Sequence, residues 1–207
     1  MAAQVQIWIN TFDLKDEVTK WSTAVTDEEL LPSLRLAQID LKTMLPAALY
    51  TAINTAVTAN YAQWTRTKTY ALNDRVLWDN RLYKALGATT NHEPPNATYW
   101  TELEIWTVWR DYFKPFLCWK TAANYIPHAN KWVAQEGLRS IVTGQNIPLN
   151  NEDTASMANH YQNVADKYYL AFTEYMNDNN DTIDTVEYTG SGEDLRTFKT
   201  SPKIRIV

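Results

Sequence analysis

Residues able to do metal or nucleophilic chemistry are few in this 207-residue chain, and their spacing matches no familiar constellation. The three histidines, His92, His128 and His160, stand far apart, and none belongs to a His-x-x-x-His or Cys-x-x-Cys pattern. The single cysteine, Cys118, lies in an apolar aromatic run and is interpreted as a buried core residue instead of a nucleophile. One cysteine also excludes a disulfide within the chain. We therefore predict no catalytic or metal-binding residue.

Neighbouring acidic residues are the other candidates for chemistry, since two carboxylates can act as a glycosidase pair. They occur as Asp16-Glu17, Asp27-Glu28-Glu29 and Glu152-Asp153, each where a helix is expected to start. Carboxylates there stabilise the positive end of the helix dipole, which explains them sufficiently. The five glycines form no phosphate-binding loop, and no Gly-x-Ser-x-Gly elbow is present. The sequence favours a protein that is not an enzyme and needs no cofactor.

Aromatic residues between positions 61 and 103 are the most specific feature. Their order is Trp64, then Tyr70-x-x-Asn73-Asp74-x-Val76-x-Trp78-x-Asn80-x-x-Tyr83-x-Ala85, then Asn91 to Pro95 and finally Trp100. This order resembles the small chitin- and cellulose-binding modules attached to chitinases, three-stranded β units that stack aromatic rings on sugars. The resemblance implies that ligand or partner contacts come from Trp64, Trp78, Tyr83, Tyr99 and Trp100. Several rings must form the core of so small a unit, so only one or two, such as Tyr99 and Trp100, are expected to stay free.

The turns of this segment carry the local evidence for strands. Residues 75–78 and 81–85 flank Asp79-Asn80, which predicts a β-hairpin. The glycines usual in such modules are replaced by Asn73 and Asn80, and because asparagine tolerates positive φ, the turns are expected to survive. Two prolines within residues 91–96 remove backbone donors, so that stretch is expected to be an exposed loop.

Helical patterns flank the aromatic segment on both sides. Thr26 and Glu29 form a capping box, and a shorter helix is expected over residues 14–21. One buried stripe follows the box, with Pro46 expected to end or bend the helix: Leu30, Leu34, Ala37, Leu41, Leu45, Leu49, Ile53 and Val57.

Three further helices are expected after the aromatic segment. The first has apolar spacing from Ile105 to Trp119, with a kink or break at Pro115. The second runs from near His128 to Val142 and stops at Gly144. The third has the clearest pattern, with steps of four and three through Met157, Tyr161, Val164, Tyr168, Ala171 and Tyr175.

The fold class predicted from these elements is mainly α. Residues 1–60 and 104–180 are expected to form one helical bundle, residues 61–103 a small three-stranded antiparallel β insert, and residues 181–207 an extended C-terminal tail. The last residues alternate polar and apolar, which is typical of a strand added within the chain or on a neighbour. A frayed terminus remains the equal alternative.

Composition limits the partners. A net charge of −5 and a pI near 5.2 argue against a general phosphate-neutralising surface, although a local basic patch remains open. Nine Trp and twelve Tyr suit either interfaces or a core. We see no secretion-signal pattern and no apolar run long enough to span a bilayer, so we expect no membrane contact.

The layout of helices around an insert resembles the head-tail connector or adaptor proteins of tailed bacteriophages, helical bundles that form a ring beneath the portal. The resemblance implies a virion structural protein at the head-tail junction, assembled in the host bacterial cytoplasm. Its partners would be copies of itself in a cyclic ring, the portal protein and other tail or connector proteins, with DNA passing through without specific recognition. The subunit interface would include Ile183, Val186, Tyr188, Leu195, Phe198, Ile204 and Ile206. The alternative is a carbohydrate-binding module on a helical scaffold used for surface attachment, and an enzyme ranks third.

Overall fold

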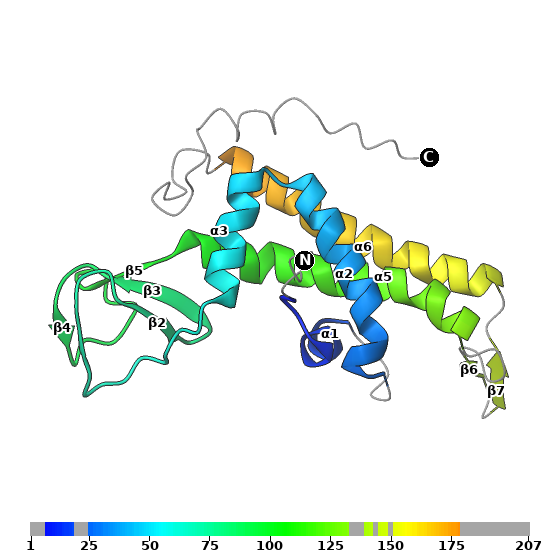
Figure 1. The fold of residues 1–207 in the computed structure, drawn as a ribbon, viewed down its shortest axis with the longest axis horizontal. Coiled ribbons are helices and arrows are strands. Elements are labelled where there is room, and N and C mark those ends of the chain that lie inside the picture. Colours follow the sequence, from blue (N-terminus) through cyan, green and yellow to red (C-terminus); the bar gives the residue numbers. More distant parts are fainter. Residues whose placement is uncertain (1–6, 19–24, 133–138, 143–144, 149–150, 179–207) are drawn as a thin grey trace, which may run out of the picture. The chain divides into compact units, whose positions relative to one another are not determined.

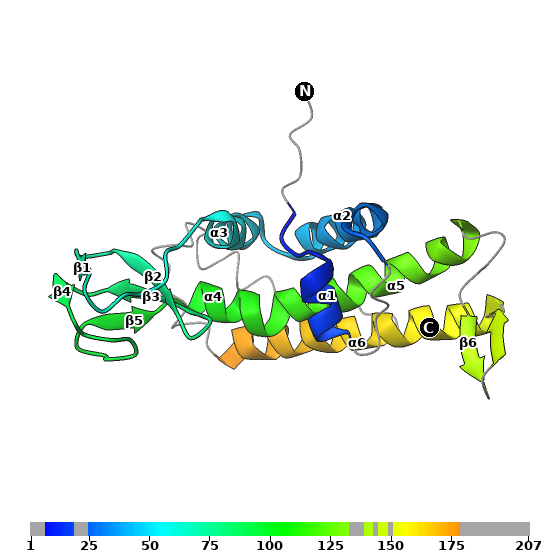
Figure 2. The same ribbon diagram turned by 90° about the horizontal axis from the view of Figure 1, so that it is seen from below.

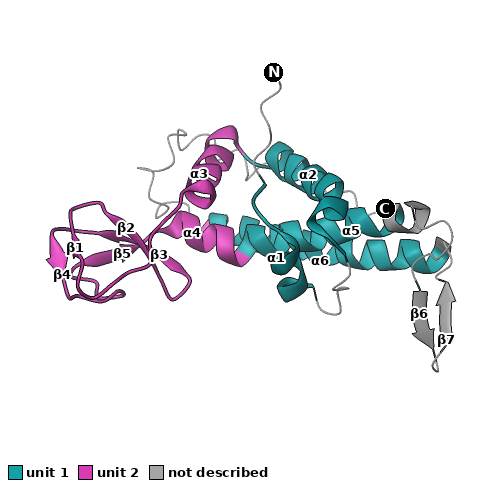
Figure 3. Cartoon of the chain, turned by 60° about the horizontal axis from the view of Figure 1, so that its bottom comes forward, with its two compact units in different colours: residues 1–45, 112–176 teal, residues 46–111, 177–207 magenta. Residues whose placement is uncertain are grey.

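The computed structural model describes residues 7–18, 25–132, 139–142, 145–148 and 151–178 (Figure 1). The chain is mainly helical with a three-stranded antiparallel sheet, which confirms the predicted fold class. It divides into two compact units, unit 1 with residues 1–45 and 112–176 and unit 2 with residues 46–111 and 177–207 (Figure 3). The predicted tail, residues 181–207, lies outside the described residues, as do all seven interface residues assigned to it.

The first helix, α1 (Thr11–Glu17), begins three residues before the predicted start. Asn10 and Asp13 form a capping box, in which each side chain accepts a 3.0 Å hydrogen bond from the other's backbone N–H. This reciprocal cap satisfies two backbone donors at the helix start. The helix predicted over residues 14–21 is confirmed at residues 14–17, but this cap places its start three residues earlier, and residues 19–21 lie outside the described residues.

The helices α2 (Asp27–Met44) and α3 (Ala47–Thr58) confirm the predicted helix and its interruption. Thr26 caps α2 in the expected box with Glu29. Leu45 and Pro46 separate the two helices. The predicted stripe is buried along its length except at half-buried Val57, although α2 belongs to unit 1 and α3 to unit 2.

Three consecutive elements follow the sheet: α4 (Glu104–Val108), the π-helical turn η1 (Trp109–Phe113) and α5 (Lys114–Trp132). The irregularity expected at Pro115 takes the form of η1, which comes immediately before it. Proline has no N–H for the usual bond four residues back, and a π turn changes the backbone pairing at that place. The helical spacing beyond Pro115 continues much further than predicted.

The helix predicted over residues 128–142 is wrong in its second half. The helix α5 runs to Trp132, and β6 (Arg139–Val142) then pairs antiparallel with β7 (Gln145–Pro148). Gly144, interpreted as a helix stop, lies outside the described residues and falls in sequence between the two strands. A glycine after a β-branched run suits a hairpin as well as a helix end, so the pattern alone did not decide.

In unit 1, α5 lies antiparallel to α6 (Asn151–Asp178) (Figure 2). Aromatic rings pack against α6 from α5 and from the end of η1: Phe113 of η1 lies 4.5 Å from Phe172, and Phe116 of α5 lies 6.2 Å from Tyr169, measured between ring centroids. Such pairs add roughly 0.5–1.5 kcal/mol each beyond the area that they bury. The helix α6 was predicted, but the centre of its buried face is Ala165, Phe172 and Met176, whereas Met157 is exposed.

Polar contacts fix the other helices of unit 1 on α5 and α6. Lys120 Nζ lies 3.3 Å from Asp40 Oδ2 of α2, and Tyr169 donates a 3.1 Å hydrogen bond to the Met44 carbonyl. The helix α1 is held by an ion pair of 2.8 Å between Asp13 and Lys114. Burial lowers the pKa of Lys114, but the hydrogen bond and charge of Asp13 outweigh it and raise that pKa overall.

The described part of unit 2 contains strands β1 to β5 and the helices α3 and α4, whereas β6 and β7 belong to unit 1. The strands β2 (Arg75–Trp78), β3 (Arg81–Ala85) and β5 (Trp100–Glu102) form the antiparallel sheet in the order β2-β3-β5, while β1 (Thr69–Tyr70) pairs with β4 (Thr89–Thr90). The helices α3 and α4 group with these strands. The unit boundaries therefore fall at residues 45/46 and 111/112, whereas the sequence placed them at 60/61 and 103/104.

Candidate functional site

The two asparagines that stand where glycine is usual hold the turns of the β module, defined here as residues 61–103. Asp79 and Asn80 have φ values of 47° and 58°, the paired positive angles of a type I′ hairpin turn. Asn73 has φ 69° and donates its backbone N–H to the Ala85 carbonyl at 2.9 Å. The predicted hairpin and the predicted tolerance of asparagine at these turns are both confirmed.

A second turn carries Asp74, which closes residues 71–74. Its carboxylate accepts the Ala71 N–H at 2.8 Å, and its carbonyl accepts the Ala85 N–H at 2.9 Å. One aspartate thus closes its own turn and ties that turn to the end of β3. The Asn73-Asp74 pair thus supplies both the positive φ and the hydrogen bonds that this turn needs.

The core of the module consists of Tyr70, Val76, Tyr83, Ala85 and Trp100. Of the five predicted contact rings, Tyr83 and Trp100 are only 3% and 2% exposed, so they belong to the core and present almost no ring surface to a ligand. Burial also raises the pKa of Tyr83. The physical reason is the small size of the unit, in which the largest rings must supply the buried area.

Three of the five predicted contact rings, Trp64, Trp78 and Tyr99, are half-buried and pack against this core. Trp64 belongs to a short stretch along the outer edge of β2, where its N–H donates to the Leu77 carbonyl at 2.8 Å. Its indole Nε1 is buried and has no hydrogen-bond partner among the described residues. These rings remain candidates for contact with a ligand or partner.

The loop that was predicted to be exposed contributes two residues that were not among the predicted contacts, His92 and Glu93. Trp78 Nε1 donates to Glu93 Oε1 at 2.9 Å, and Trp100 Nε1 donates to the His92 carbonyl at 2.8 Å. The His92 ring stacks on Tyr99 with 3.6 Å between centroids and an interplanar angle of 16°. Two indole donors and one stacked ring therefore fix this loop, which places a carboxylate beside half-buried aromatic rings.

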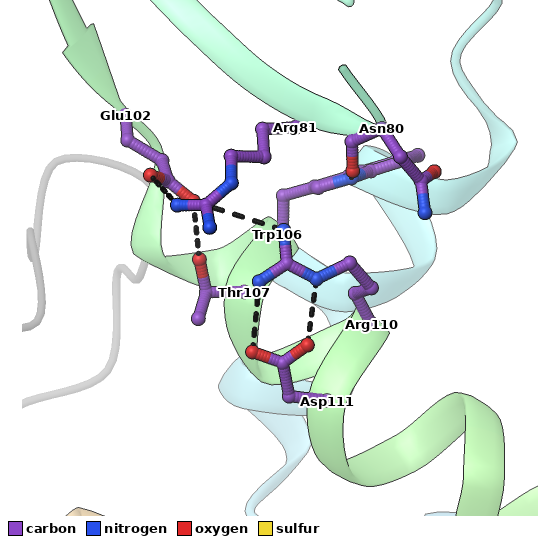
Figure 4. A network of polar contacts seen from close by, with 7 residues as sticks. All are labelled: Asn80, Arg81, Glu102, Trp106, Thr107, Arg110 and Asp111. Atoms are coloured by element: carbon purple, nitrogen blue, oxygen red, sulfur yellow. Dashed lines mark hydrogen bonds and ion pairs between the residues drawn. The ribbon is translucent and has the colours of Figure 1, made fainter. Parts of the chain in front are cut away.

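A polar network joins the hairpin turn, β5, α4 and η1 within unit 2 (Figure 4). Glu102 accepts from Arg81 at 2.8 Å through Oε2 and from the Thr107 hydroxyl at 2.9 Å through Oε1. Arg110 donates two hydrogen bonds to the Asp111 carboxylate, at 2.6 and 2.8 Å. The network therefore contains two arginines and two carboxylates. The hydrogen bonds that Arg110 donates to Asp111 raise the pKa of Arg110, and the one that Arg81 donates to Glu102 raises the pKa of Arg81.

The same region includes one hydrogen bond between uncharged groups. Trp106 Nε1 donates to the Asn80 carbonyl at 3.1 Å, so α4 holds the hairpin turn through its backbone (Figure 4). Because every charge in the network faces an opposite one, the arrangement suits positioning better than proton transfer. No local motif could have predicted it, since residues that bond one another lie up to 26 positions apart.

Exposed apolar side chains gather on the helices of unit 1. On α1 and α2, Phe12 is 74% exposed, Leu36 44% and Ile39 47%, while α6 exposes Met157 and Leu170. Leu36 and Ile39 lie three residues apart and share one face of α2, with exposed Pro32 one turn earlier. Sequence periodicity marks buried faces, so it did not predict which apolar side chains would remain outside.

The remaining residues considered for chemistry are dispersed. Cys118 is buried, as predicted, and burial raises the pKa of its thiol far above the ordinary value. His160 is exposed on α6, and the side chain of His128 lies outside the described part. Among the described residues, no group of three or more His, Cys, Asp or Glu could hold a metal ion. Within the same part of the chain, none of the helices is long and apolar enough to cross a membrane.

Comparison with known proteins gives one family. No curated protein and no solved structure matches the chain. A family described as a family of unknown function, DUF6712, matches residues 74–196, from the Asp74 turn through the β module, α4, α5 and α6. Since the match covers more than half of the 207 residues, the chain belongs to the DUF6712 family of unknown function.

Proposed function

We propose that this protein is a structural subunit of a phage virion, which forms a ring at the head-tail junction through contacts between copies. The observation that carries the proposal is the set of exposed apolar side chains on unit 1, above all Leu36 and Ile39, which share one face of α2, together with Phe12 on α1. Large apolar side chains that share an exposed face are typical of protein interfaces, whereas scattered single ones need no explanation.

The interior of unit 1 supports this interpretation, because its helices do not need the exposed residues for their own packing. The helices α5 and α6 meet through buried rings, and α2 is fixed by Lys120 and Tyr169. Leu36 and Ile39 lie on the opposite side of α2 from buried Leu34 and Leu41. They are therefore available to a neighbouring subunit.

The location in a virion comes from the resemblance to connector proteins. In such a ring, each copy would contact the next head to tail, and the portal protein would lie on one side. A chain with net charge −5 suits a channel through which DNA passes without being held. The DNA would meet no sequence-reading contact.

Size-exclusion chromatography with multi-angle light scattering tests the proposal, with and without the phage's portal protein. We expect a discrete oligomer, and we expect Leu36→Ser combined with Ile39→Ser to shift it toward monomer. The matched control is Leu72→Ser, which removes a 60% exposed leucine from unit 2. A monomer in all samples, portal included, would refute the ring.

A second candidate function is carbohydrate binding by the β module. The specific observation in its favour is Tyr99 stacked on His92 beside the Trp78–Glu93 pair, which combines ring faces with a hydrogen-bond acceptor. Chitin pull-down should then be lost in Tyr99→Ala and Trp78→Ala and kept in Tyr61→Ala, which removes a half-buried ring elsewhere in unit 2. Equal retention of all three variants would exclude this role.

A further inference from the structure

The outer face of α1 and the start of α2 combine one highly exposed ring with exposed acids. Phe12 lies two residues before buried Leu14 and so points away from the face that α1 packs, and Asp16 follows Phe12 by one turn. The Thr11 N–H donates to Asp27 Oδ1 at 2.7 Å, which brings the start of α1 against the start of α2. We call the exposed side chains there the Phe12 face: Phe12, Asp16, Asp27, Glu28 and Glu29.

The charge of this part of the chain is strongly one-sided. Residues 7–18 and 25–45 contain seven acidic and three basic residues. Of the basic residues, Arg35 and Lys42 stand on the later turns of α2, away from its acidic first turn. Lys15 on α1 lies close enough to Asp27 to help the hydrogen bonds from Thr11 lower the pKa of that carboxyl. An exposed aromatic side chain with an acidic surround suits a partner that is both apolar and basic.

The chain itself contains a segment of that composition. Residues 195–207 carry four basic residues and no acidic one, together with five large apolar residues. The basic residues are Arg196, Lys199, Lys203 and Arg205, and the apolar ones are Leu195, Phe198, Ile204, Ile206 and Val207. Position 195 is 17 residues beyond the end of α6 at Asp178, a stretch that spans at most about 60 Å when fully extended. This length sets the limit on how far from the end of α6 the segment can bind.

We propose that the Phe12 face binds residues 195–207 of a second copy of this chain. This inference rests on the proposed ring and names one of its contacts. Each copy has a net charge of −5, so copies that approach one another repel unless opposite charges meet. A basic apolar segment on an acidic face supplies that attraction at one place and removes the Phe12 ring from water.

Photo-cross-linking of the full chain tests the contact. A copy with p-benzoylphenylalanine in place of Phe12 is mixed with copies labelled with a heavy nitrogen isotope, and cross-linked peptides are identified by mass spectrometry. We expect cross-links from position 12 to residues 195–207 that join one light and one heavy chain. The control carries the same probe in place of Leu72 and should give no such peptide.

Cross-links to residues 195–207 within single copies only, or cross-links to other residues only, would overturn the proposal. Light scattering on the same samples distinguishes a failure of this contact from a failure of the proposed ring. If the protein assembles into a ring but gives either of these cross-linking results, the contact is refuted and the ring proposal still stands. A chain that neither assembles nor cross-links refutes both. Circular dichroism of each labelled protein checks that the helices are retained.

Charge reversal gives a second, independent readout. Lys203→Glu with Arg205→Glu should lower the yield of hybrid cross-links roughly tenfold, since two exposed charge pairs become repulsive. Asp16→Lys with Glu28→Lys on the probe-bearing copy should restore that yield when mixed with the reversed tail. The interaction should also weaken as salt rises from about 0.05 M to about 0.5 M. An unchanged yield in the reversed tail would overturn the pairing of charges.

Discussion

Replacement of Asn80 by alanine, with glycine as the matched control, tests whether the hairpin turn holds the geometry described. Asn80 has φ 58°, in the left-handed region where a side chain without a local hydrogen bond costs roughly 1–2 kcal/mol. Asparagine tolerates this region better than alanine, so we expect Asn80→Ala to lower the free energy of unfolding by about 1 kcal/mol.

The glycine variant isolates the backbone effect. Glycine adopts positive φ freely but has a more flexible unfolded state, and these effects oppose one another. We therefore expect Asn80→Gly to stay within about 0.5 kcal/mol of the original chain. The Trp106 indole of α4 donates a hydrogen bond to the backbone carbonyl of residue 80, which both variants keep. This bond therefore does not contribute to a difference between the alanine and glycine variants.

Urea denaturation followed by tryptophan fluorescence measures the difference. With a slope of about 1 kcal/mol per molar urea for a unit of this size, the midpoint of Asn80→Ala should fall by about 1 M. Amide hydrogen exchange at Val76 and Leu82, both buried in the sheet, assigns the transition to unit 2. Alanine and glycine variants that agree within about 0.3 kcal/mol would refute the positive φ at this turn.

Three further predictions follow from buried rings, a shifted pKa and an interhelical bond. Trp100→Ala should destabilise unit 2 by roughly 3–5 kcal/mol, and Tyr99→Ala by clearly less, as measured by urea denaturation; equal losses would contradict their assignment to core and surface. Hydrogen bonds from Thr11, first from its side chain and then from its backbone, lower the pKa of Asp27. The ionised Asp27 carboxylate therefore stabilises the fold at pH values above the pKa that Asp27 has in the unfolded chain. This stabilisation is lost as the pH falls through the pKa that Asp27 has in the folded chain. The stability difference between the original chain and Asp27→Asn should shrink below about pH 4, whereas a difference independent of pH would exclude the effect. Tyr169→Phe should cost about 1 kcal/mol by removing the bond to the end of α2, and no change in thermal unfolding would show that this bond contributes nothing.

Local rules predicted the elements whose cause is local. The Thr26 capping box, the break at Pro46 and the Asp79-Asn80 hairpin each depend on residues within a few positions of one another. The box of Asn10 and Asp13 is equally local but was not predicted.

Nonlocal packing explains the other differences. Tyr83 and Trp100 were predicted to contact a ligand, but the choice between core and surface depends on how much apolar area the whole module contains. The strand pairing of residues 139–142 depends on residues 145–148 in a register that no helical period reveals. The polar network around Glu102 likewise joins residues that only the fold brings together.

Imaging the assembled particle by electron microscopy tests the central claim most directly, with purified chain added to the portal protein of its phage. We predict closed rings of a single size in which the Phe12, Leu36 and Ile39 side chains lie at contacts between copies. Single copies bound separately, or rings in which these three side chains all face solvent, would contradict the account.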